Sequence, residues 1–107
     1  LSRHKQIFDG YSELERVDLR GAELDHLDLT RSCFAYANLE GASLANTALT
    51  DSTLTDANLR STNLTRADLS GADLSRADLT DADLHGVITS DTTTWPDGFT
   101  PPQPTRL

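Results

Sequence analysis

The 107-residue sequence contains no methionine, one cysteine and few aromatic residues, and only 36% of its residues are hydrophobic. A compact globular core normally draws on a larger apolar share, so this composition favours a thin or repetitive core. The lone Cys33 excludes an intrachain disulfide, which is typical of a reducing compartment. No apolar run approaches the roughly 18 residues of a membrane span, so we expect a soluble chain without a membrane partner.

Basic residues are also scarce, with nine Lys and Arg against seventeen Asp and Glu and a net charge of −8. Nucleic-acid binding needs a basic footprint, so this balance argues against direct contact with nucleic acid. The acidic charge fits a basic protein partner, or it serves solubility alone. The sequence also lacks a charged-then-apolar signal segment, so we expect a cytoplasmic protein. Because the sequence starts at Leu1 and not at Met, it leaves open whether a targeting segment precedes it.

What the sequence has instead is a five-residue repeat, clearest in ADLSGADLSRADLTDADL (residues 67–84). Fifteen large apolar residues follow one another at intervals of five without an insertion, and a small or apolar residue precedes each by two positions. These central residues form the predicted core: Leu14, Leu19, Leu24, Leu29, Phe34, Leu39, Leu44, Leu49, Leu54, Leu59, Leu64, Leu69, Leu74, Leu79 and Leu84. Internal repetition of this kind decides the architecture.

An α-helix cannot use a five-residue period, because five residues advance the chain by about 500° and successive leucines never share a face. In an extended chain, residues two apart point to the same side, so Ala67 and Leu69 point inward while Asp68 points outward. Ser70 and Gly71 must then turn the chain before the next pair. The pattern therefore predicts a coil with small and large residues inside, stacked in layers about 4.8 Å apart.

The motifs ADLSG, ADLSR, ADLTD, ANLEG, ANLRS and TNLTR resemble the pentapeptide-repeat family. The resemblance covers residues 12–86, about seventy per cent of the chain. It implies an all-β fold, a right-handed quadrilateral parallel β-helix with one repeat per side and about four coils. We therefore expect an N-terminal capping segment at 1–11, the β-helix at 12–86, and a C-terminal cap with a Pro-rich tail at 87–107.

A solenoid of this kind exposes apolar core and unpaired backbone at both ends, which predicts a cap at each end. Phe8 and Tyr11 are the candidates for the first coil, and Trp95 and Phe99 for the last. The four prolines near the C-terminus stop further strand pairing, because proline has no N–H to donate. Alternatively, one end is a dimer surface. The sequence therefore leaves two oligomeric states open, a monomer and an end-to-end homodimer.

No group of residues predicts catalysis, so we expect no enzyme, no catalytic or metal site and no cofactor. His26 and His85 fall on one side of the coil but about 14 Å apart, too far to share a zinc ion. Cys33 points outward between Glu13 and Thr53 and has no histidine beside it, which predicts an inert surface thiol.

The four Asp residues of residues 67–84 lie on four successive sides and diverge, which disfavours a calcium or paired-carboxylate site. Asp and Asn at this position can instead accept hydrogen bonds from nearby backbone in turns. The same register stacks Asn38 on Asn58, which predicts a short amide ladder. It also stacks Arg20, Glu40 and Arg60, which predicts a column of alternating charge.

Three functions fit these features. The first is a non-enzymatic repeat scaffold that mediates protein–protein interaction with an unidentified partner. The alternative, which the family resemblance implies, is a DNA mimic that binds a type II topoisomerase (gyrase) and confers quinolone resistance. A third is ice binding through Thr30, Thr50 and Ser70, although no second parallel rank of threonines accompanies them.

Overall fold

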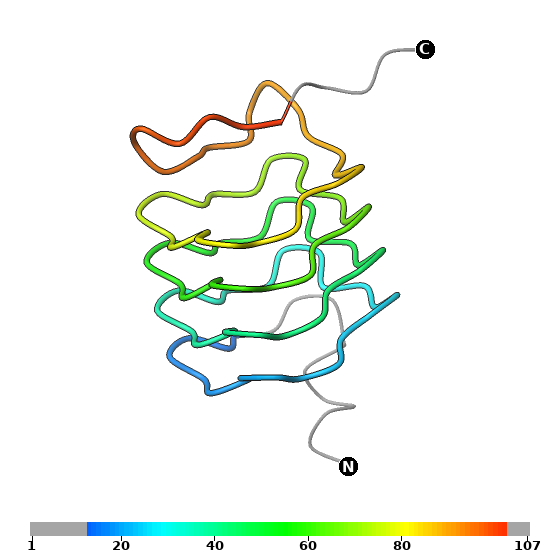
Figure 1. The fold of residues 1–107 in the computed structure, drawn as a ribbon, viewed down its shortest axis with the longest axis vertical. Helices are drawn as coiled ribbons and strands as arrows, with labels where there is room; N and C mark the ends of the chain where they lie inside the picture. The colour runs from blue at the N-terminus through cyan, green and yellow to red at the C-terminus, as the bar shows by residue number, and fades with distance from the viewer. Residues whose placement is uncertain (1–12, 103–107) are drawn as a thin grey trace.

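The computed structural model describes residues 13–102, which wind into stacked, similar layers (Figure 1). Thirteen parallel β-bridges connect the layers, and twelve of them join residues twenty apart, from Glu13–Cys33 to Asp68–Ile88. One layer therefore takes four five-residue repeats, one for each side. Each side contributes a single bridging residue and not a longer strand, and residues 13–102 contain no helix. The described residues thus include no helix of the length and apolarity that a membrane crossing requires.

A turn follows the central residue in every repeat. The residue two positions after the centre has a positive φ, from +58° to +71°, in all fifteen repeats, although only four of these residues are glycine. The next N–H folds back onto the central carbonyl, as Ala37 does onto Phe34 at 2.9 Å. A positive φ at the third residue of a four-residue turn is the geometry of a type II turn. The chain therefore changes direction once every five residues.

Backbone hydrogen bonds hold the layers together, as residues 38–42 illustrate. The N–H of Asn38 donates to the preceding layer at 2.9 Å. The N–H groups of Leu39 and Gly41 donate to the following layer at 2.8 and 2.9 Å. The N–H of Ala42 closes the turn at 2.9 Å. Only the N–H of Glu40 has no backbone partner, so one donor per repeat needs a side chain.

The core is a column of the central side chains. Those from Leu14 to Leu79 are all buried, and Leu84 in the last full layer is half-buried. Alanines and hydroxyl residues two positions before most centres, and Val17 and Leu27 before two of them, fill the space between them. Thr47 and Ser52 lie inside because their hydroxyls donate to core carbonyls, at 2.7 and 2.9 Å. The interior is therefore filled by side chains.

Parallel pairing continues beyond residue 86, where Ile88 bridges to Asp68. The next bridge joins Asp73 to Thr94, twenty-one residues apart, so one extra residue shifts the last layer. Trp95 and Phe99 pack on the core there, and their rings stack with centroids 5.4 Å apart. The candidate N-terminal cap residues, Phe8 and Tyr11, lie outside the described residues.

Candidate functional site

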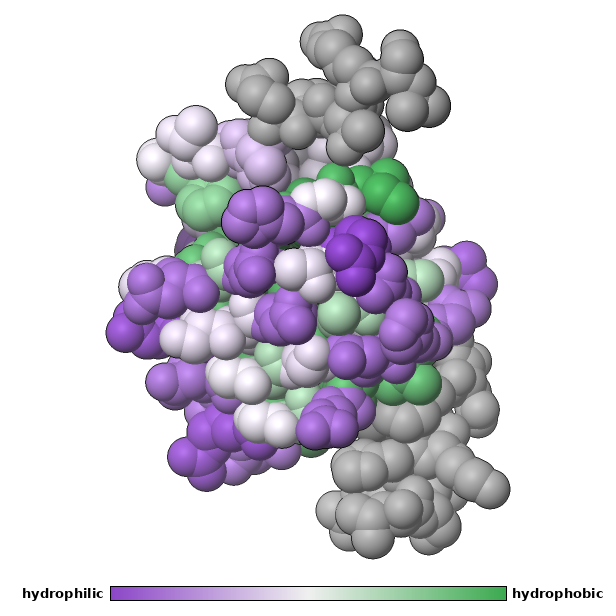
Figure 2. All heavy atoms as spheres, turned by 45° about the vertical axis from the view of Figure 1, so that its right-hand side comes forward, coloured by the Kyte–Doolittle hydropathy of each residue, from purple (hydrophilic) through white to green (hydrophobic). Residues whose placement is uncertain are grey.

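The outer surface of the rod is built from three positions of each repeat, one before the central residue and two after it. Side chains at these positions are exposed or half-buried, except Ala35 and Ala45. Figure 2 shows hydrophilic and near-neutral side chains over most of the face in view, with the most hydrophobic atoms towards the C-terminal end. Among residues 13–102, two large apolar side chains are exposed, Tyr36 at 50% and Ile88 at 53%. Arg16 lies over the Tyr36 ring, 4.5 Å from its centroid.

Asp and Asn side chains one position before the central residue accept the backbone N–H that has no backbone partner. In nine repeats the side-chain oxygen accepts the N–H of the residue two positions later, at 3.0 to 3.2 Å. The nine are Asp18, Asp28, Asn38, Asn58, Asn63, Asp68, Asp73, Asp78 and Asp83. The fifth N–H of these repeats is therefore satisfied by the carboxylate or amide of the same repeat.

The predicted amide ladder does not form. The main chains of Asn38 and Asn58 bridge, but each side-chain oxygen is used within its own repeat. The amide nitrogen of Asn58 donates to Glu40 instead, at 3.5 Å. The predicted column of Arg20, Glu40 and Arg60 does stack, because the N–H groups of Gly21 and Gly41 donate to the carbonyls of Glu40 and Arg60, both at 2.9 Å. Its arginines pair with aspartates and not with their neighbour in the column: Arg20 pairs with Asp18 at 2.8 Å, and Arg60 pairs with an aspartate of the next layer. Among residues 13–102, no ion pair joins Glu40 to either arginine.

These hydrogen bonds stabilise the charged form of five aspartates. The guanidinium of Arg20 lowers the pKa of Asp18, and it is the largest cause there. Side-chain donors two residues later lower the pKa of Asp28, Asp73, Asp78 and Asp83, followed in size by the main-chain N–H of the same residue. These carboxylates therefore remain ionised, and their role is to stabilise turns.

The residues with potential metal or nucleophile chemistry lie apart. Cys33 is a free, half-buried thiol whose main chain bridges to Glu13 and Thr53. His85 is exposed, and its Nδ1 lies 2.6 Å from Oδ1 of Asp83 in its own repeat. Within residues 13–102, no three His, Cys, Asp or Glu side chains gather in a way that could hold a metal ion.

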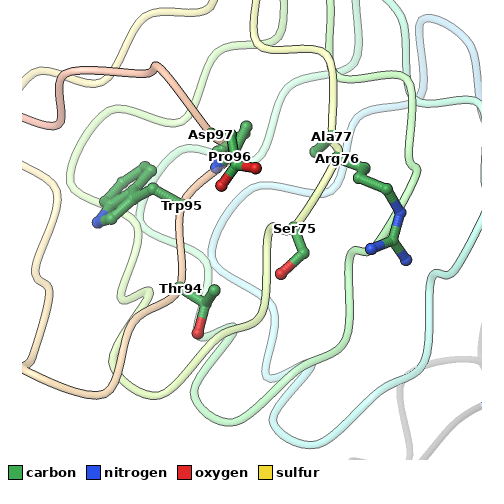
Figure 3. A pocket seen from close by; sticks show the side chains of 7 residues that line it. All are labelled: Ser75, Arg76, Ala77, Thr94, Trp95, Pro96 and Asp97. Carbon is green, nitrogen blue, oxygen red and sulfur yellow. The ribbon is translucent and has the colours of Figure 1, made fainter.

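Sequence reasoning missed three hollows at the C-terminal end, where the shifted last layer lies over residues 75–85. The first, about 360 Å³, lies between Ser75–Ala77 and Thr94–Asp97 (Figure 3). The Trp95 ring and the guanidinium of Arg76 point in opposite directions, so neither is aimed at the other across it (Figure 3). The break in the five-residue period after Val87 is the sequence signal that could have revealed this gap.

The other two hollows continue along the same end. One of about 320 Å³ is lined by Ala77–Thr80 and Pro96–Phe99. The other, about 280 Å³, is lined by Leu84, His85, Phe99, Thr100 and Pro102. The last layer thus covers the core less closely than the layers below cover one another.

Comparison with known proteins supports this architecture. A solved pentapeptide repeat protein from Nostoc PCC 7120 is 30% identical over 92% of this chain and 86% of that one, with a TM-score of 0.62. A second, from the cyanobacterium Cyanothece 51142, is 32% identical over 74% of this chain, with a TM-score of 0.32. The Nostoc protein HetL, involved in heterocyst differentiation regulation, is 35% identical over 70% of this chain, with a TM-score of 0.40. The chain spans 64% and 37% of the length of the last two.

A family model described as "Pentapeptide repeats" matches residues 32–71 and 54–88, more than half of the chain. Among curated protein sequences, none matches. The fold of the family is a right-handed quadrilateral β-helix, in agreement with the bridges between residues twenty apart. The repeat, the register and both kinds of comparison lead to one conclusion: the chain belongs to the pentapeptide repeat family.

Proposed function

We propose that the chain is a non-enzymatic scaffold, a rod of about four coils that binds a protein partner in the cytoplasm. The observation that carries the proposal is that hydrogen bonds between layers and within turns hold the backbone beneath the outward side chains. In residues 38–42, for example, all five N–H groups have a partner. A surface held this rigidly loses little conformational entropy when a partner docks.

The filled interior supports the same proposal. Leucine, phenylalanine, alanine and small hydroxyl side chains occupy the core, so a partner must bind the outside or an end. Three hollows lie at the C-terminal end, where charged and polar side chains alternate with apolar ones. Such mixed surfaces are typical of contacts between proteins.

A capture experiment tests the scaffold proposal. The folded chain is immobilised, exposed to a lysate of cells that express it, and compared with the Leu54→Asp variant, in which a buried core residue becomes charged. We expect a protein that the folded chain retains and the variant does not. Retention of the same proteins by both, or of none by either, would contradict a surface that depends on the fold.

The alternative function, DNA mimicry directed at a type II topoisomerase, has one observation in its favour. Residues 13–102 carry sixteen Asp and Glu against six Arg, a high density of negative charge for a rod of this size. Three of the six arginines pair with aspartates, and the acidic residues are distributed over all four sides. A DNA supercoiling assay with gyrase distinguishes the two functions, because a DNA mimic inhibits the enzyme and a scaffold for another partner does not.

A further inference from the structure

Residues 77–81, on one side of the last full layer, lack the backbone partners that the same side has one layer earlier. There, the N–H groups of Leu59 and Ser61 donate to carbonyls of residues 77–81, both at 2.8 Å. Within the described part of the chain, the equivalent N–H groups of Leu79 and Asp81 have no acceptor. An unpaired parallel edge of this kind is a template for another chain.

The residues opposite this edge belong to the described part of the chain, but they do not pair with it. In the shifted register of the last layer, residues 98–102 lie opposite residues 77–81. The N–H of Phe99, which in this register would reach the carbonyl of Ala77, donates instead to Pro96 in its own turn at 3.1 Å. That carbonyl receives a backbone N–H from none of the described residues. The edge is therefore unpaired because the chain above it forms a separate turn.

Two adjoining hollows lie between this part of the last full layer and the segment above it. The hollow of about 320 Å³ is lined by Ala77–Thr80 and Pro96–Phe99, and the hollow of about 360 Å³ by Ser75–Ala77 and Thr94–Asp97. Figure 3 shows the second hollow between its two stretches of chain. The unpaired edge therefore faces space that the described residues leave unfilled.

The hollow of about 320 Å³ has an apolar floor. Ala77 and Leu79 are buried, and Phe99 is half-buried and packs against the core. An apolar side chain that enters this hollow would lose water-exposed surface against all three. The hollow thus suits a segment that carries one apolar side chain beside its main-chain hydrogen bonds.

The charge around the edge selects the partner. Residues 73–102 contain six aspartates and one arginine, Arg76, which pairs with an aspartate of the layer below at 3.0 Å. Asp78 and Asp97 line the hollow of about 320 Å³. Asp78 pairs with Arg60 at 3.4 Å, which leaves the other aspartates of this end in excess. These carboxylates repel a free anion, so the unpaired N–H groups suit the neutral carbonyls of a main chain whose side chains are basic.

We propose that residues 77–81 bind an extended, basic segment of a partner protein by parallel pairing along this edge. The first residue of the segment donates its N–H to the carbonyl of Ala77 and accepts the N–H of Leu79. The carbonyl of its third residue accepts the N–H of Asp81. The first and third side chains are Lys or Arg and face the aspartates, and the second is apolar and enters the hollow. Main-chain pairing supplies affinity and the side chains supply selectivity. The proposal rests on the proposed scaffold function and specifies its surface.

The probe is a fluorescein-labelled synthetic peptide with Lys-Leu-Arg at its centre and glycines on both sides. The same peptide with Glu at both basic positions is the control. We expect the basic peptide to bind, and to bind less tightly as sodium chloride is raised from about 0.05 to 0.5 M, whereas the acidic peptide should not bind. In amide hydrogen exchange measured by NMR, the basic peptide should slow the exchange of the N–H groups of Leu79 and Asp81.

Methylation of the peptide nitrogens separates main-chain pairing from attraction by charge alone. A methyl group on the lysine nitrogen removes the donor to the carbonyl of Ala77, so we expect binding to weaken about fivefold. A methyl group on the arginine nitrogen is the matched control, because that N–H does not face the edge, and this peptide should bind like the unmethylated one. The same affinity for both methylated peptides would contradict pairing in this register.

Two charge variants locate the site. Asp78→Asn, Asp81→Asn and Asp97→Asn together remove three charges around the hollow. They keep the turn geometry, because Asn at position 78 accepts the same N–H and Asn at position 81 tolerates the positive φ. We expect this variant to lose about tenfold in peptide affinity. The matched control, with Asp18, Asp28 and Asp51 changed to Asn, alters the net charge equally elsewhere and should bind like the original chain.

Three other outcomes overturn the proposal. Equal binding to both charge variants would show non-specific attraction to the rod. Slow exchange of the N–H groups of Leu79 and Asp81 before any peptide is added would show that the chain itself or a second copy of it closes the edge. If the variant at Asp78, Asp81 and Asp97 still captures the same protein from lysate as the original chain, the scaffold function stands and the partner binds another surface.

Discussion

Asp73 illustrates what a single outward carboxylate does in this fold. Its Oδ1 accepts the N–H of Ser75 at 3.0 Å and the hydroxyl of the same serine at 2.6 Å. The N–H is the one donor of the repeat that the ladder and the turn leave unused. An acidic residue that looks like part of a binding cluster in the sequence is therefore part of the backbone structure.

These turn aspartates predict that the rod loses stability in acid. The pKa of Asp18, Asp28, Asp73, Asp78 and Asp83 is lower in the folded chain than the ordinary value of 3.8. A carboxylate whose pKa is lowered by folding contributes its full stability above the unfolded pKa. That contribution is lost as the pH falls below about 4 towards the folded pKa. The melting temperature, followed by circular dichroism, should therefore drop below about pH 4.

A variant with Asn at all five positions provides the control. Asn keeps the acceptor oxygen but does not titrate, so its melting temperature should depend less on pH over the same range. If the variant and the original chain lose the same number of degrees between pH 5 and pH 3, these aspartates do not cause the acid sensitivity.

Leu54 tests the core at the same scale. Its side chain is 1% exposed and lies midway along the rod, with the leucines of other layers and sides around it. Leu54→Asp would bury a carboxylate without a partner, at a cost of several kcal/mol. We expect a chain that is unfolded at room temperature by circular dichroism. Leu84→Asp, at the half-buried end, should remain folded with a lower melting temperature; equal loss in the two variants would contradict the assigned register.

At the scale of the repeat, the turn makes the strictest demand on the residue type, because it requires a positive φ. Eleven residues other than glycine adopt a positive φ, one in each repeat that lacks glycine at this position. An L-residue pays roughly 1–2 kcal/mol for the left-handed conformation, and Asn and Asp pay least. The hydrogen bonds of the surrounding layers hold these residues in place, so each repeat contains local strain that stacking offsets.

A pair of substitutions at equivalent turns measures this strain. Gly41 has φ +71°, and a Cβ built there meets nothing within 4 Å, so Gly41→Ala should cost about 1 kcal/mol from backbone conformation alone. Ser61 occupies the same turn one layer later with φ +59°, so Ser61→Gly should stabilise the rod by about 0.5 kcal/mol. Urea unfolding reports both values, and shifts in the same direction would contradict the explanation.

The period of five made much of this element predictable. Alternation of side chains determines which residues of a repeat point inward. The two residues after the central one must then form the turn. The partners of Asn58 were not predictable: its side-chain oxygen accepts the N–H of Arg60, and its amide nitrogen donates to Glu40 and not to another asparagine. Local backbone donors compete with stacked side chains, and the register alone does not say which of the two binds.

The C-terminal end was less predictable for a different reason. The extra residue between Ile88 and Thr94 shifts the register by one, and nothing in the periodic part of the sequence specifies how the chain absorbs it. Here Thr93, which is buried, donates its hydroxyl to the carbonyl of Leu69 at 2.8 Å and so holds the shifted layer. The hollows at this end lie between the shifted layer and the layer below it.

At the scale of the whole molecule, the rod behaves as a stack in which each layer contacts only its neighbours. The bridges join adjacent layers, so the stability of an end depends on one neighbour and that of the middle on two. The stacked aromatic pair Trp95 and Phe99 packs against the core at the C-terminal end. The cap therefore determines how readily the C-terminal layer opens.

Trp95→Ala tests the cap. Trp95 is half-buried, so its removal should cost about 2 kcal/mol, less than a fully buried aromatic would. The loss should be local, because only the terminal layer rests on it. The N–H groups of Leu69 and Leu74, which donate to Ile88 and Thr94 at 2.7 Å, should exchange faster with solvent, whereas that of Leu44 keeps its protection.

Thr100→Ala, at an exposed position of the same segment, is the control and should leave amide exchange unchanged. Faster exchange at Leu44 by the same factor as at Leu74 would mean that the rod opens as one cooperative unit, and the layers could then not be treated as a stack of separately stable neighbours.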